Sequence, residues 1–132
     1  MTHPRKSLRA SLLSVLTGLP ATGSHVYQYK RYPLDPSVLP AIRFYVTGDD
    51  ANEKAISQKT APLDRNVRVT VEVVVKQADA AEAAVDDICE SVEAAIDAAS
   101  LPIGRYVGTE IDTELIADQQ VVVGRMSYEF QV

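Results

Sequence analysis

The stretch Val67-Arg68-Val69-Thr70-Val71-Glu72-Val73-Val74-Val75-Lys76 decides the fold of this chain. Valine occupies every odd position from 67 to 75, and the even positions are polar except for Val74. Successive side chains of a strand point to opposite faces, so this period of two predicts a strand with one buried face and one wet face. β-Branched residues suit such a half-buried surface. We expect it to be the central strand, with the other elements placed by what covers its valine face.

The size and charge of the chain describe an ordinary globular domain with an uneven charge distribution. A chain of 132 residues is long enough for one domain with its own core. The first 76 residues carry 11 Lys or Arg and 6 Asp or Glu, whereas residues 77–132 carry 2 and 12. A basic half and an acidic half can supply complementary surfaces for copies of the chain or for partners, and can equally be two solvated faces.

Two helices are predicted, one on each side of the central strand in sequence. The first follows Pro4, with Thr2 or His3 as its cap and Gly18 as its end. The second runs from Asp79 to Ala99. Both have apolar side chains at helical spacing. For the first these are Leu8, Leu12, Val15, Leu16 and Leu19, and for the second Ala81, Ala84, Val85, Ile88, Val92, Ala95, Ile96 and Ala99.

Four further strands are predicted from alternation, at 26–32, 41–47, 106–115 and from 122 to the end. In the strand at 106–115 we expect Val107, Ile111 and Leu115 to point inward. The order of elements predicts an α+β domain, with a largely antiparallel mixed sheet of about five strands and two helices packed on one face. The other face is expected to lie in water or against a polar partner. It would carry Arg43, Arg68, Glu72, Glu110, Asp112, Glu114, Arg125 and Glu129.

A long charged connection separates the second and third strands. Residues 48–66 have no sustained apolar period, and a loop of this length in a compact domain is often mobile or functional. We therefore expect a single domain over residues 1–132 with a mobile loop at about 48–66, which a tolerated surface insertion would also explain.

The sequence contains no recognisable catalytic, metal or cofactor site. His3 and His25 are not at the spacing of metal ligands, and Cys89 is the one cysteine. There is no phosphate-binding glycine loop and no nucleophile elbow. Asp86, Asp87 and Glu90 are better explained as a solvated helix face than as a cation site. No apolar run approaches the ~20 residues of a membrane span. We expect a non-enzymatic protein that needs no cofactor and does not enter a membrane.

Three segments taken together resemble the tail terminator family of long-tailed phages, also described as minor tail proteins. One is the first helix followed by Gly18-Leu19-Pro20-Ala21-Thr22-Gly23 and Val26-Tyr27. Another runs from Arg31-Tyr32-Pro33-Leu34 through Leu39-Pro40-Ala41-Ile42 to Tyr45-Val46. The last joins the valine strand, the acidic helix, Gly108-Thr109-Glu110-Ile111 and Tyr128-Glu129-Phe130. The resemblance covers nearly the whole chain, although each segment is a structural pattern and no catalytic motif is involved.

The resemblance implies a virion protein that forms a six-membered ring at the head-proximal end of the tail tube. Such a ring stops tube polymerisation and presents the surface that joins the head. Its partners would be further copies of itself, the tail tube protein and the head–tail connector protein, with DNA only passing through the lumen. A ring built head to tail needs two different complementary surfaces on each subunit.

The family carries no interface motif, so the interface candidates come from this sequence alone. They are the charged side chains of the predicted polar sheet face and of the loop, namely Arg43, Asp49, Asp50, Lys54, Lys59, Arg65 and Arg68. Two other readings stay open at this point. One is a head-completion or connector protein of similar fold. The other is a cellular ligand-binding or enzyme domain, which would need a concave apolar pocket with convergent polar groups.

Overall fold

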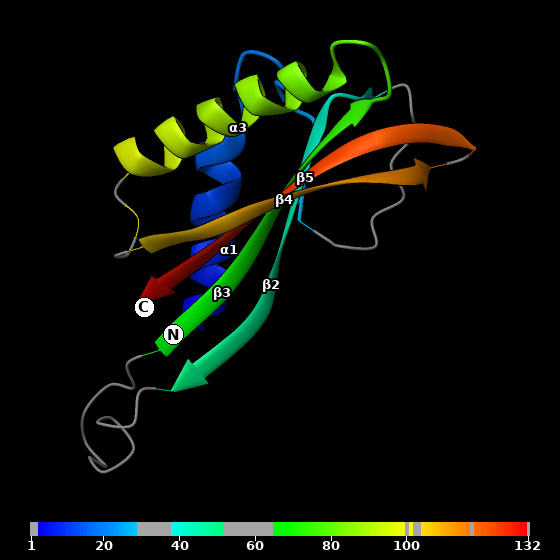
Figure 1. Ribbon diagram of the computed structural model, residues 1–132. Coiled ribbons are helices and arrows are strands. Elements are labelled where there is room, and N and C mark those ends of the chain that lie inside the picture. Colours follow the sequence, from blue (N-terminus) through cyan, green and yellow to red (C-terminus); the bar gives the residue numbers. More distant parts are fainter. Residues whose placement is uncertain are drawn as a thin grey trace, which may run out of the picture.

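A computed structural model describes residues 3–28, 38–51, 65–99, 101, 104–116 and 118–131. The described elements are two helices and five strands (Figure 1). In chain order they are α1 (Pro4–Leu16), β1 (Val26–Tyr27), β2 (Ala41–Ala51), β3 (Arg65–Lys76), α3 (Ala81–Ala98), β4 (Gly104–Ile116) and β5 (Gln119–Gln131).

The strands form one sheet in the order β1-β2-β3-β5-β4. Strand β3, the valine stretch, lies in the middle as predicted. Only the β1–β2 pair is parallel, and the other three pairs are antiparallel. The predicted α+β class and largely antiparallel mixed sheet are therefore confirmed.

Helix α1 begins and packs as its sequence predicts. The Nδ1 atom of His3 accepts a hydrogen bond from the backbone N–H of Arg5, and Pro4 occupies the first turn. Leu8, Leu12 and Leu16 are buried against β1 and β2. Gly18 follows the helix with φ of 94°, a conformation that costs glycine little.

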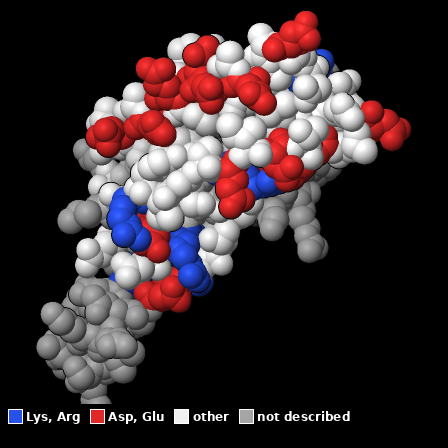
Figure 2. All heavy atoms as spheres, in the orientation of Figure 1, with Lys and Arg blue, Asp and Glu red and all other residues white. Residues whose placement is uncertain are grey.

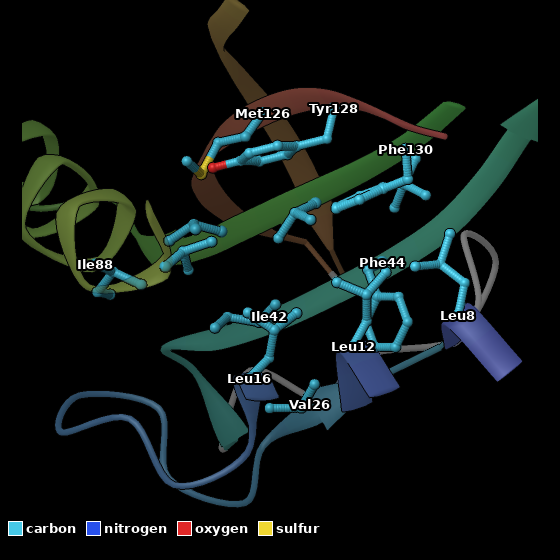
Figure 3. Close-up of a cluster of buried hydrophobic side chains, with 14 of the residues drawn as sticks. Leu8, Leu12, Leu16, Val26, Ile42, Phe44, Ile88, Met126, Tyr128 and Phe130 are labelled. Carbon is cyan, nitrogen blue, oxygen red and sulfur yellow. The ribbon is translucent and has the colours of Figure 1, made fainter. Parts of the chain in front are cut away.

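Helix α3 covers β3 and β5 on the same face of the sheet that α1 covers. Ile88 and Val92 join one core with the α1 leucines and with side chains of β2, β3 and β5 (Figure 3). The helix lies close to β5 because Gly124 has no side chain. A Cβ atom at Gly124 would come within 2.7 Å of Val85 Cγ1. With this close approach, α3 packs mainly on β3 and β5, and most of β4 is not covered by the helix.

A second, smaller apolar cluster lies on the opposite face of the sheet, where the sequence predicts polar side chains. Val74 of β3 packs there with Val121 and Val123 from the start of β5, and all three are fully buried. Partly buried residues around them include Tyr27, Val38, Leu39 and Ile116. The polar face is therefore apolar at one end, where Val38 and Leu39 before β2 and Ile116 at the end of β4 pack over it.

Two predicted boundaries are wrong at the described residues. The expected loop at 48–66 is shorter, because Gly48–Ala51 continue β2 and Arg65 and Asn66 begin β3. A break in register between Val46 and Gly48 disguises this continuation in the sequence, since a bulge shifts the alternation by one residue. Residues 52–64, where the rest of that predicted loop falls, lie outside the described part of the chain.

Candidate functional site

The predicted polar sheet face contains a buried network of charges at its centre. Glu72 is 1% exposed, and its carboxylate accepts hydrogen bonds from Arg43 Nε at 3.0 Å and Nη2 at 3.3 Å. Arg125 Nε lies 3.5 Å from the same carboxylate, and the Tyr45 hydroxyl donates to it at 3.3 Å. Glu114 of β4 ion-pairs with both arginines and completes the network.

This network corrects the prediction that the whole face lies in water or against a polar partner, because its centre is buried within the domain. Arg43, Glu72 and Arg125 are register partners across β2, β3 and β5, so their opposite charges meet directly. Arg43 is only 8% exposed, and its guanidinium lies against the carboxylates of Glu72 and Glu114. Burial and the adjacent Glu72 carboxylate raise the pKa of Tyr45, which keeps its hydroxyl protonated as a donor. The arrangement holds β2, β3, β5 and β4 together and is structural.

The other interface candidates gather at the end of the sheet where β2 finishes and β3 begins. Asp49 is ion-paired with Arg65 at 2.8 Å and with Arg5 of α1 at 3.5 Å. Arg68 passes over Gly48 and reaches Asp50, with N···O at 3.4 Å and both side chains largely exposed. The structure thus brings Asp49, Asp50, Arg65 and Arg68 together. Lys54 and Lys59 lie outside the described residues.

Strand β4 forms one edge of the sheet and carries exposed apolar side chains. Tyr106, Ile111 and Leu115 are 46%, 50% and 69% exposed. Their register places them on the helix-covered face, yet α3 packs mainly on β3 and β5 and leaves them about half exposed or more. Val107, also exposed, sits in a bulge that interrupts the register with β5. The prediction that Val107, Ile111 and Leu115 point into the core is wrong. These side chains are exposed because β4 is an edge strand, and the order of strands in a sheet cannot be read from local alternation.

All charged side chains on the outer side of α3 are acidic, as the spacing of its carboxylates indicates. Figure 2 shows acidic side chains gathered along this helix with no basic side chain between them. None of them forms an ion pair with the parts of the chain that the structure describes. They are Glu82, Asp86, Asp87, Glu90, Glu93 and Asp97.

Two open hollows lie between α3 and β4. One, of about 410 Å³, is lined at the end of α3 by Glu93, Ile96 and Asp97 and on the sheet by Tyr106 and Tyr128. The other, of about 600 Å³, lies near the start of α3. It is lined by Gln77, Ala78, Asp79, Ala81, Glu82, Ile111, Asp112, Thr113 and Val122.

The described residues offer no assembled metal or membrane site. Within them, no three His, Cys, Asp or Glu side chains are placed to hold a metal ion. Neither helix is long and apolar enough, over its described length, to span a bilayer.

The lone cysteine is expected to react slowly. Burial, together with Glu93 and Asp86, raises the pKa of the Cys89 thiol to about 11. Because the thiolate is the reactive form, alkylation by iodoacetamide at pH 8 should be roughly tenfold or more slower than that of free cysteine. Urea-unfolded protein should react at the free-cysteine rate, and equal rates in the folded and unfolded chain would contradict this assignment.

Comparisons with known proteins add little to this geometry. No protein-family model and no curated protein matches the sequence. Among solved structures, the chain is similar to a chain of the "virion of native gene transfer agent (GTA) particle". The two are 15% identical, with 99% of this chain and 100% of that chain covered and a TM-score of 0.44. A similarity of this strength does not by itself indicate function.

Proposed function

We propose that this chain is a non-enzymatic phage virion assembly protein of the tail-terminator type. In this proposal it forms a ring, hexameric as in the family it resembles, on the head-proximal end of the tail tube. The ring ends tube polymerisation and presents the surface to which the head–tail connector binds. The resemblance of three ordered segments over nearly the whole sequence supplies the choice of family.

The structural observation that supports assembly is the uncovered edge strand β4. It is 13 residues long, and one of its faces exposes Tyr106, Ile111 and Leu115. Natural sheets protect long edge strands, because their unpaired backbone groups pair readily with other chains. An exposed apolar face beside such an edge marks an interaction surface. This fits a subunit whose sheet edge is covered by a neighbour in a ring.

We place the contact with the tail tube at the β2–β3 end of the sheet. Asp50 and Arg68 present exposed charges there, on either side of the connection that contains Lys54 and Lys59. Asp49 supports this end through its ion pairs with Arg65 and with Arg5. Arg43 has no place in the proposed contact, because its guanidinium is buried in the network around Glu72.

The proposal is tested by disrupting the gene in the parent phage and imaging the lysate by negative-stain microscopy. Headless tubes of variable excess length are the expected result. Tails of normal length beside filled heads would instead support the head-completion alternative. Normal infectious particles would overturn both virion readings.

A surface variant sharpens the test in the same phage. Ile111→Asp with Leu115→Asp should leave the free energy of unfolding within about 1 kcal/mol of wild type, because both side chains are half exposed or more. Complementation with this variant should nevertheless give overlong tubes, since the edge face no longer fits a neighbour. Glu110→Gln, on the opposite face of β4, is the matched control and should restore normal tails. Normal tails with the double variant would rule out this face.

A further inference from the structure

The hollow at the end of α3 contains a buried polar group without a partner. The Tyr128 side chain is 5% exposed, and its hydroxyl makes no hydrogen bond with the described residues. Buried hydroxyls are almost always hydrogen-bonded, and an unpaired one costs about 1–3 kcal/mol. Tyr128 lines the hollow together with Glu93 and Asp97. The hydroxyl can donate or accept, so among the described residues the site lacks a hydrogen-bond partner for it.

The surroundings of that hydroxyl define which partner fits. Glu93 and Asp97 contribute two carboxylates with no cationic partner in the described chain. Burial, followed by the charge of Glu93, raises the pKa of Tyr128, so the hydroxyl stays neutral beside them. The ring of Tyr106, packed edge-on against Tyr128 at 5.5 Å between centroids, forms an apolar wall. A long basic side chain suits all three groups. Its charged N–H group can pair with the carboxylates and donate to the hydroxyl, and its apolar stem can pack on the Tyr106 ring.

The chain itself carries unpaired basic side chains near the opposite edge of the sheet, on the face that both helices cover. Lys6 and Arg9 of α1 make no ion pair with any described residue. The first turn of α1 has no acidic residue, so the positive end of the helix dipole adds to their charge. Helix α1 packs on β1 and β2, whereas the hollow lies beside β4 at the far end of the strand order.

We propose that the hollow formed by Glu93, Asp97, Tyr106 and Tyr128 binds the basic start of α1 from a second copy of this chain. Lys6 or Arg9 of that copy pairs with the two carboxylates and donates to the Tyr128 hydroxyl. The contact joins two different surfaces, so it repeats head to tail and closes into a ring when the rotation permits. This inference rests on the proposed ring and names the surfaces that build it.

Charge reversal of each surface tests the contact. One variant carries Lys6→Glu with Arg9→Glu, and the other Glu93→Lys with Asp97→Lys. Sedimentation velocity and native mass spectrometry of the full chain measure assembly across protein and salt concentrations. We expect each variant to weaken self-association by about tenfold or more, because like charges then face each other. An equimolar mixture of the two should assemble again, since every contact regains opposite charges.

Controls and contrary outcomes separate this contact from the ring itself. Lys76→Glu and Glu110→Lys reverse exposed charges elsewhere and should leave assembly unchanged, and circular dichroism confirms that each variant is folded. Assembly unaffected by both reversals would overturn the contact, while normal tube capping by the same variants would leave the proposed function standing. Recovery only as two-membered species would overturn the head-to-tail arrangement. A wild-type chain that stays monomeric at every concentration would overturn the inference as well, and its capping of tubes would be judged separately.

Discussion

Replacing Glu72 with alanine is expected to lower the free energy of unfolding by about 3–5 kcal/mol, the usual cost of removing one partner of a buried ion pair. Glu72 is 1% exposed, accepts hydrogen bonds from Arg43 and Tyr45, and forms an ion pair with Arg125. Without it, the Arg43 guanidinium stays buried with Glu114 as its remaining carboxylate partner in the described chain. Urea unfolding followed by circular dichroism measures the loss.

Two variants make the Glu72 result specific. Glu110→Ala removes an exposed carboxylate that pairs in register with Arg125, and it should cost less than about 0.5 kcal/mol. Glu72→Gln keeps the shape and a hydrogen-bond acceptor, and it should fall between the two. A loss of less than about 1 kcal/mol for Glu72→Ala would show that the network behaves as an exposed pair does.

The second large effect is expected at Gly124, where any side chain meets α3. Gly124→Val should destabilise the fold by about 1–3 kcal/mol, as overpacking of a close-packed core generally does. The structural reason is the 2.7 Å approach of an added Cβ to Val85 Cγ1, an atom on a stiff β-branched side chain. Relief requires α3 to move away from β5, so the same change should also widen the hollows beside β4.

A double-mutant cycle checks this mechanism. Gly124→Ala and Val85→Ala are each expected to destabilise the protein, the second by opening space in a buried site. Together they should cost less than the sum of the two single losses, because the methyl group at position 124 then occupies the space that Val85 leaves. Strictly additive losses would show that the two positions do not compete for the same space.

The sequence allowed the scaffold to be predicted because its strongest patterns are local. Alternating valines are sufficient to predict β3, and helical spacing of Leu8, Leu12 and Leu16 is sufficient to predict α1. The candidate surfaces were only partly predictable. Asp50 and Arg68 are exposed as proposed for an interface, but Arg43 has the same alternating context as Arg68 and is buried. Nothing in the residues next to Arg43 distinguishes it, because its burial depends on Glu72, 29 positions away.

The sequence by itself determined which segments become helices and strands, which face of β3 carries its alternating valines, and how charge divides between the two halves of the chain. Those properties depend on the period of side chains along one segment, and a segment carries its own period. The tertiary structure alone decided that β4 is an edge strand with Ile111 and Leu115 exposed, and that Tyr128 lines a hollow where its hydroxyl has no hydrogen-bond partner among the described residues. Strand order and the reach of α3 are set by contacts between distant segments, so solvent exposure at the sheet edge cannot be read from alternation.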